Sequence, residues 1–333
     1  MLITRLSRCK PSRHIVGLFA LLLATSPLSV YANEVDDWAA PIQQADLHKA
    51  AGRYEEALTI YKEFANKENG LAQFNVALFY QLGLSTKTDK AEACHWFHRA
   101  AINNMPGAMQ QVGNCFAHGL GGQIDINQAI HWYTKAYQQG VHATYCQIGL
   151  LYLKGEGVQK DTGKAVDMCL KGAELGAFNA QVVMAKWYFY GTHVKQDYQK
   201  AFFWLQYAAN KKSPESAFLM ALYYDQGIGM EIDLKQALRW YEISASQAYE
   251  AAYLPTAALY WQAFLDHQKE SLLAKSYLWA QAHCLSSHAV SQDSLRLKNK
   301  IEDVMPNTWQ DALDEKVVAH LNKFQKHQHN NNC

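Results

Sequence analysis

The densest group of potentially reactive side chains in this sequence is formed by Cys94, His95 and His98. A helix would place His95 and His98 on one face, and His131 follows His95 by 36 residues. Three imidazoles brought together by stacked helices could bind a zinc ion. No glutamate stands beside them as a general base, so we expect these histidines to lie on an exposed helical face without a metal.

Other catalytic signatures are weak. Gly119 and Gly121 follow a predicted helix rather than a strand, so they are typical of a turn and not of a phosphate-binding loop. Ser7 and Lys10 come closest to the Ser-x-x-Lys motif of penicillin-recognising enzymes, but they lie in an N-terminal segment that we expect to be removed. The tail histidines could bind a divalent metal only weakly. We therefore predict no catalytic residue, no cofactor and no metal site.

A 36-residue period indicates the elements that position these side chains. Six aromatic residues keep this step: Tyr80, Phe116, Tyr152, Tyr188, Tyr224 and Tyr260. The first five are followed after three residues by glycine, after nine by aspartate and after thirteen by alanine. Trp96, Trp132, Trp204 and Trp240 share a further phase. Such self-similarity is the signature of a repeat array, in which these residues form the core.

Each period is predicted to fold as a helical hairpin. In the unit 141–176, one helix spans 144–154 and ends at Gly155, because glycine adopts the left-handed terminal conformation without strain. Asp161 can cap the second helix, 162–175, and Glu92 follows Asp89 at the spacing of a capping box. Gly149 should admit a closely packed neighbouring helix. Helices this short are marginal alone, so stability must come from stacking.

These motifs resemble the Sel-one-like repeat, a relative of the tetratricopeptide repeat. The resemblance is clearest at Gly149, Tyr152, Gly155, Gly157, Val158, Asp161, Lys164 and Ala165. It implies an all-α, right-handed superhelical solenoid. We predict a signal peptide at 1–32, a tetratricopeptide-like hairpin at 33–70, five repeats at 71–248, a degenerate sixth repeat with Pro255 in its first helix at 249–286, capping helices at 287–324 and a disordered tail at 325–333.

The N-terminus predicts export. Four basic residues without an acid precede an apolar run that is too short to span a bilayer, and Val30 and Ala32 suit cleavage after Ala32. Cleavage would leave 27 basic and 30 acidic residues, a net charge near −3, so nucleic acid is not an expected partner. No later stretch reaches membrane-spanning length. We predict a periplasmic or secreted protein.

An oxidising compartment would allow disulfides. Cys94 and Cys115 lie almost equally far from the predicted turn at 103–106, and Cys146 and Cys169 lie almost equally far from the turn at 155–158. Antiparallel helices would place each pair at one height, although the side chains must also face each other. Both disulfides are therefore possible. Cys284 and Cys333 have no obvious local mates.

A binding surface is expected on the side of each first helix that faces away from the core. This outward stripe comprises Asn75, Leu78, Phe79 and Leu82, then Gln111, Asn114 and His118, then Gln147, Leu150 and Lys154, then Val183, Lys186, Trp187 and Tyr190, and finally Leu219, Leu222, Tyr223 and Gln226. We predict that Phe79, Trp187, Tyr190 and Tyr223 contact a partner, because aromatic side chains are favoured anchors, and that Lys186 meets an acidic group. Alternatively, the stripe packs on the adjacent repeat.

The function that these observations favour is a non-enzymatic exported scaffold that holds a protein or peptide of unknown identity, in envelope signalling, assembly or host interaction. The resemblance also implies an alternative, because some members of this family carry a β-lactamase or penicillin-binding label. That alternative is a cell-wall-associated protein that binds peptidoglycan or β-lactams. A third possibility, a redox protein using Cys94 and Cys115, would require reactive thiols.

Overall fold

The computed structural model describes residues 39–209, 213–286 and 291–331 of the 333-residue chain. The predicted signal peptide and its cleavage site lie outside the described residues. The described part contains no strand, and its α-helices are α2 (Ala39–Ala50), α3 (Tyr54–Asn66), α4 (Gly70–Leu82), α5 (Lys90–Ile102), α6 (Pro106–His118), α7 (Ile126–Gln138), α8 (Ala143–Lys154), α9 (Thr162–Glu174), α10 (Phe178–Tyr190), α11 (Tyr198–Ala209), α12 (Pro214–Gln226), α13 (Leu234–Ala245), α14 (Tyr253–His267), α15 (Glu270–Ser286), α16 (Gln292–Glu302) and α17 (Gln310–Asn331). Two short 3₁₀ helices, η2 (Glu250–Ala252) and η3 (Asn307–Trp309), precede α14 and α17.

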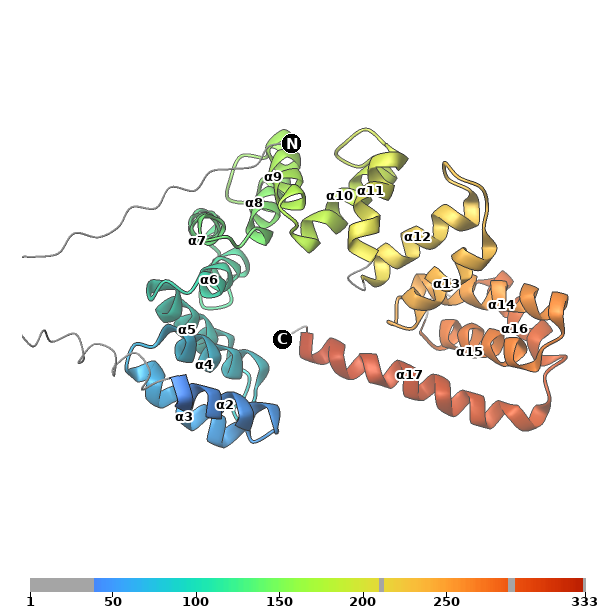
Figure 1. Ribbon diagram of the computed structural model, residues 1–333, viewed down its shortest axis with the longest axis horizontal. Coiled ribbons are helices and arrows are strands. Elements are labelled where there is room, and N and C mark those ends of the chain that lie inside the picture. Colours follow the sequence, from blue (N-terminus) through green and yellow to red (C-terminus); the bar gives the residue numbers. More distant parts are fainter. Residues whose placement is uncertain (1–38, 210–212, 287–290, 332–333) are drawn as a thin grey trace, which may run out of the picture.

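Consecutive helical hairpins follow one another along an arc (Figure 1). In this view the first helices α6 and α8 lie toward the inside of the arc, and their partners α7 and α9 lie further out (Figure 1). The helix α17 runs back from the C-terminal end of the arc across its open side. The predicted all-α solenoid of helical hairpins with a 36-residue period is thus confirmed.

The turn inside each of the five central hairpins is closed by the same backbone hydrogen bond. The amide of the aspartate donates to the carbonyl of the ladder aromatic nine residues earlier, at 2.9 to 3.0 Å, in Asp89–Tyr80, Asp125–Phe116, Asp161–Tyr152, Asp197–Tyr188 and Asp233–Tyr224. Gly83, Gly119, Gly155, Gly191 and Gly227 have φ between +64° and +73°, a region that costs other residues strain. This geometry explains why the aromatic, the glycine and the aspartate recur together at the 36-residue period.

The aspartate side chains cap the second helices as predicted. Each accepts a hydrogen bond from the backbone amide three residues later, at 2.8 to 3.0 Å. The predicted capping box at Asp89 is only half formed, however. The Glu92 carboxylate instead accepts a hydrogen bond from the indole nitrogen of Trp96 at 2.7 Å, because the Asp89 amide already donates to Tyr80.

The tryptophan ladder and the small residues of the first helices lie in the core. Trp96, Trp132 and Trp204 are buried. A Cβ atom on Gly149 would stand 2.7 Å from the carbonyl oxygen of Ala165 on α9, and one on Gly113 would strike the ring of Tyr133. These glycines therefore allow the close helix approach that the sequence predicts.

The C-terminal part departs from the repeat pattern at its turns. Pro255 lies in the first turn of α14, where the missing amide hydrogen breaks no intrahelical bond, so the helix is intact. Gln268 takes the left-handed position that glycine holds in the other hairpins, at φ +51°. Residues 325–331, predicted to be a disordered tail, continue the helix α17. Among the described residues, no helix has the length and apolar character needed to cross a membrane.

Candidate functional site

One position on the first helices is exposed in all five central repeats. It carries a different residue each time: Leu82, His118, Lys154, Tyr190 and Gln226. Leu82 is 50% and Tyr190 is 53% exposed, although both belong to residue types that normally pack inward. The position four residues earlier, occupied by Leu78, Asn114, Leu150, Lys186 and Leu222, is half-buried or exposed. We call these two positions the inner stripe.

Three of the predicted contact residues belong to the core instead. Phe79 and Tyr223 are at most 1% exposed and Trp187 is 7% exposed, so the prediction that they line an open surface is wrong. They share one phase of the repeat, at which the side chain points toward the preceding hairpin. Phe79 packs edge-on against Tyr54 and Tyr61.

Tyr223 shows why this position must pack. Its ring lies against Phe189, Tyr198 and Phe202 of the preceding repeat, with ring centroids 5.2 to 6.3 Å apart. Its hydroxyl donates a hydrogen bond to the backbone carbonyl of Tyr198 at 2.6 Å, and burial raises the pKa of Tyr223 far above its usual range. The alternative left open by the sequence, packing on the adjacent repeat, describes this position.

Tyr190 and Lys186 do lie on the inner stripe. The Lys186 ammonium forms an ion pair with Glu215 of α12 at 2.7 Å, so a residue of the chain itself already provides the acidic group expected there. Partial burial and the Glu215 carboxylate raise the pKa of the Tyr190 hydroxyl. Burial and the Glu215 carboxylate also raise the pKa of the Tyr249 hydroxyl. The side chains of Lys186, Tyr190, Glu215 and Tyr249 therefore lie near one another, between α10, α12 and η2.

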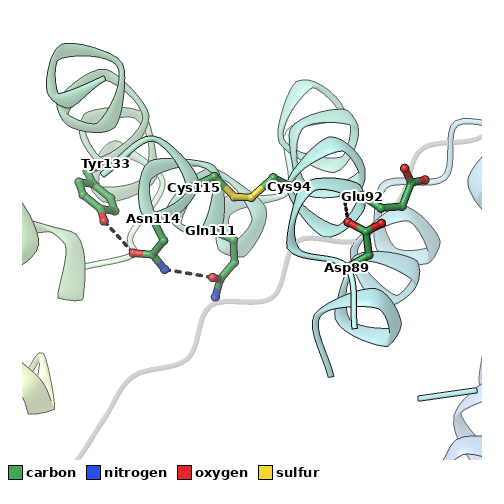
Figure 2. Close-up of a disulfide and its surroundings, with 7 residues drawn as sticks. All are labelled: Asp89, Glu92, Cys94, Gln111, Asn114, Cys115 and Tyr133. Carbon is green, nitrogen blue, oxygen red and sulfur yellow. Dashed lines mark hydrogen bonds between the residues drawn. A yellow bond between two sulfur atoms is a disulfide. The ribbon is translucent and has the colours of Figure 1, made fainter. Parts of the chain in front are cut away.

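Both predicted cysteine pairs lie at disulfide distance. The sulfur atoms of Cys94 and Cys115 are 1.96 Å apart and join α5 of one repeat to α6 of the next (Figure 2). Those of Cys146 and Cys169 are 2.03 Å apart and join the two helices of a single hairpin. Cys284 is free and half-buried. The first disulfide therefore fixes neighbouring repeats to each other, whereas the second acts within one repeat.

The Cys94–Cys115 disulfide borders two hollows. One, of about 560 Å³, is lined by His95, His98 and Gly121 among others. The other, of about 590 Å³, lies on the inner stripe, and its polar lining is Gln81, Lys90, Gln111, Asn114 and His118. Among the residues that the structure describes, no carboxylate lines this second hollow. Hereafter we call it the inner hollow.

A chain of side-chain amides ends at the inner hollow. Gln110 donates to Gln147 at 2.9 Å, Gln147 donates to Asn114 at 3.0 Å, and Asn114 donates to the oxygen of Gln111 at 3.0 Å. The hydroxyl of Tyr133 also donates to the Asn114 oxygen, at 2.7 Å, and Figure 2 shows the resulting Tyr133, Asn114 and Gln111 network.

His95, His98 and His131 lie against tryptophan rings and do not converge on one point. His98 and His131 each lie edge-on to Trp132, and His95 lies edge-on to Trp96. Burial lowers the pKa of His98, and the nearby His95 and Lys135 lower it further. Nowhere in the described part of the chain do three or more His, Cys, Asp or Glu side chains gather closely enough to hold a metal ion.

Several residues of these sites escaped sequence reasoning. Lys90 and Gln81 come from the ends of helices that border a turn, and Glu215 lies in the first turn of α12. No spacing rule within one helix connects them to the inner stripe, because the stacking of separate repeats brings them there. Gln111, Asn114 and His118 were on the predicted stripe, but the direction of the hydrogen bond between Asn114 and Gln111 was not predictable.

Similar solved structures share the fold along most of the chain. A Sel1 repeat protein from Oxalobacter formigenes is 26% identical, with a TM-score of 0.60, and the alignment covers 79% of this chain and 99% of that one. A protective antigen of uropathogenic Escherichia coli strains, displaying an SLR fold, is also 26% identical, with a TM-score of 0.56 over 81% of this chain and 61% of the antigen.

A shorter similarity exists to HRD3A of Arabidopsis thaliana, an ERAD-associated E3 ubiquitin-protein ligase component. It is 34% identical over 74 residues, which cover 22% of this chain and only 11% of that protein. The family model for the Sel1 repeat matches residues 70–105, 106–141, 143–176, 179–213 and 214–249. These five matches take up more than half of the sequence and coincide with the hairpins α4–α5 to α12–α13. The chain therefore belongs to the Sel1 repeat family.

Proposed function

We propose that this protein is a non-catalytic scaffold that binds a protein or peptide along its inner stripe. Sel1 repeats are generally non-enzymatic scaffolds for protein–protein interaction. The observation that carries the proposal is the position of the stripe that is exposed in all five repeats, which changes from Leu82 to His118, Lys154, Tyr190 and Gln226 while the glycine and the aspartate of each turn repeat. Exposed side chains that differ at one structural position from repeat to repeat are available for recognition.

Export belongs to the same proposal. The N-terminal pattern of basic and apolar residues predicts a secretory signal. Two cysteine pairs at disulfide distance fit an oxidising compartment outside the cytoplasm. HRD3A is by its description a component of a larger assembly, and an exported scaffold would play a comparable part in an envelope or extracellular complex.

The test compares two doubly substituted proteins in pull-downs from an envelope fraction, with mass spectrometry of the eluate. Leu82→Ala with Tyr190→Ala removes two exposed side chains of the inner stripe. Phe203→Ala with Tyr207→Ala is the matched control, because these aromatic side chains are each 49% exposed but lie on the second helix α11. The stripe variant should lose a partner that the wild type and the control retain.

Two results would overturn the proposal. Equal retention by both variants would show that the stripe does not bind. Stoichiometric covalent labelling by a fluorescent penicillin would replace the scaffold with the cell-wall alternative.

A further inference from the structure

The described residues that line the inner hollow offer hydrogen-bond donors and include no carboxylate. We propose that it binds a carboxylate of an acidic peptide segment, with Lys90 and Gln111 as the principal donors. The inference rests on the proposed scaffold function and specifies the chemistry of one contact with the partner. It assigns a site at the junction of α4, α5 and α6, next to the Cys94–Cys115 disulfide.

The amide chain makes Gln111 a donor toward the hollow. Since Gln110, Gln147 and Asn114 each pass a hydrogen bond in the same direction, the Gln111 oxygen is already occupied by the Asn114 amide. The Gln111 nitrogen points away from Asn114 (Figure 2), and it has no hydrogen-bond partner in the part of the chain that the structure describes. An amide fixed by such a network offers N–H groups and not an oxygen.

The charge around the hollow favours an anion. Within residues 39–209, 213–286 and 291–331, the Lys90 ammonium forms no ion pair, and the side chains of Gln81 and His118 form no hydrogen bond. The nearest acid in sequence, Asp89, is engaged at the N-terminus of α5, where its carboxylate accepts the Glu92 amide. The partial positive charge of that helix end offsets the Asp89 charge. A carboxylate in the hollow could accept from the Lys90 and Gln111 side chains together.

The dimensions of the hollow suit a side chain or chain end of a peptide. Its volume of about 590 Å³ exceeds that of a single small ion, and Phe97, Leu120 and the disulfide supply apolar surface beside the donors. His118 and Asn114 also belong to the inner stripe, so the hollow is continuous with the surface proposed to hold the partner. The occupant is therefore an acidic residue of a peptide that runs along the stripe.

The experiment measures fluorescence anisotropy of labelled Gly-Ser decapeptides with the oxidised protein. One peptide carries two glutamates at a free carboxyl end, a second carries them internally with an amidated end, and a third has glutamine in their place. At least one glutamate peptide should bind about tenfold more tightly than the glutamine peptide, which corresponds to one charge-assisted hydrogen bond. The first two peptides distinguish a chain-end carboxylate from a side-chain carboxylate.

Three variants locate the binding. Gln111→Glu keeps an oxygen for Asn114 but replaces the donor with a negative charge, and Lys90→Ala removes the cation; each should weaken glutamate-peptide binding about tenfold. Lys87→Ala is the matched control, since it removes an equal charge from an exposed position of the same turn. Circular dichroism verifies that all three fold.

Equal binding of the glutamate and glutamine peptides, no binding of either, or equal effects of Lys90→Ala and Lys87→Ala would overturn the carboxylate site. The pull-down separates this failure from failure of the scaffold. A partner that is retained by the wild type and lost by the stripe variant would leave the scaffold function standing without the carboxylate site.

Discussion

Single residues on the first helices differ sharply in role although they are close in sequence. Trp187 and Tyr190 are three residues apart on α10, yet Trp187 is buried and Tyr190 is more than half exposed. The two have similar aromatic area, so their effects on stability depend on burial and not on residue type. They therefore form a natural pair for testing which positions hold the stack.

Replacing Trp187 by alanine should lower the free energy of unfolding by about 3–5 kcal/mol, because it leaves a cavity between two repeats. Replacing Tyr190 by alanine should change it by about 0.5 kcal/mol or less. Urea denaturation followed by circular dichroism measures both. Equal losses would mean that Tyr190 also belongs to the core.

Glycines allow a second comparison at the same scale. A Cβ on Gly149 would collide with the backbone carbonyl of Ala165, which cannot rotate away, whereas one on the exposed Gly163 would meet only an Asp161 oxygen at 3.5 Å. We expect Gly149→Ala to destabilise the protein by about 1–3 kcal/mol through overpacking. Gly163→Ala should stabilise it by about 0.4–1 kcal/mol by restricting the unfolded chain. The same urea denaturation experiments measure both changes. An unchanged free energy of unfolding in Gly149→Ala would show that the two helices can separate without cost.

Among the elements, α17 carries a half-buried histidine where it packs on the rest of the chain. Its first part packs on α15 through Val317 and Leu313, and its remainder extends across the open side of the arc (Figure 1). His320 stands at the junction, with its Nε2 atom 3.2 Å from the Tyr253 hydroxyl and its ring edge-on to Trp279. Burial lowers the pKa of His320 below 6.5, helped by Lys323 and opposed by a hydrogen bond with the backbone of Ala245.

The sign of this pKa shift predicts acid sensitivity. Because the docked helix has the lower His320 pKa, the undocked helix binds the proton more tightly. The contribution of His320 to docking is complete above pH 6.5 and is lost as the pH falls from there through the docked pKa. Hydrogen exchange of α17, measured relative to α9 and corrected for intrinsic rates, should rise between about pH 7.5 and about pH 5. The His320→Gln variant should show no such rise, and an unchanged rise in this variant would contradict the assignment.

At the scale of the whole molecule, the two disulfides stabilise the repeat array in different ways. They close loops of similar length, with sequence separations of 21 and 23 residues, so loop entropy alone gives each about 3–4 kcal/mol. Their positions differ, since Cys94–Cys115 connects two repeats and Cys146–Cys169 lies inside one. In a solenoid each repeat is stabilised by its neighbours, so a link between repeats couples their unfolding.

Removing Cys94 and Cys115 together by serine substitution should therefore broaden the urea transition and lower its apparent slope, because the N-terminal hairpins α2–α5 would unfold before the rest. The Cys146→Ser, Cys169→Ser double variant is the matched control and should lower stability with less broadening. Cysteine-independent probes, tryptophan fluorescence and circular dichroism, would reveal the separation as non-coincident curves. Coincident curves in both variants would show that the packing of α5 on α6 is sufficient to couple the repeats.

The sequence by itself determined the architecture, because the constraints on it are local and recur. The glycine of each turn, the aspartate that caps the following helix and the aromatic whose carbonyl closes the turn act within about ten residues of one another, so their 36-residue step reveals the hairpin directly. The same turns also predicted which cysteines lie opposite each other on adjacent helices. The capping box at Asp89 is only half formed because the Asp89 amide already donates to the Tyr80 carbonyl that closes the turn, and the Glu92 carboxylate accepts from Trp96 of the same helix.

Only the tertiary structure decided which side chains are open. Phe79, Trp187 and Tyr223 lie next to the open stripe on their helices, and a rotation of one residue on a helix separates a packed face from an exposed one. The inner hollow likewise depends on α4, α5 and α6 meeting, since Lys90 and Gln111 belong to different repeats. Hairpin structure is encoded within one repeat, whereas burial and the candidate binding site arise from the stacking of one repeat on the next.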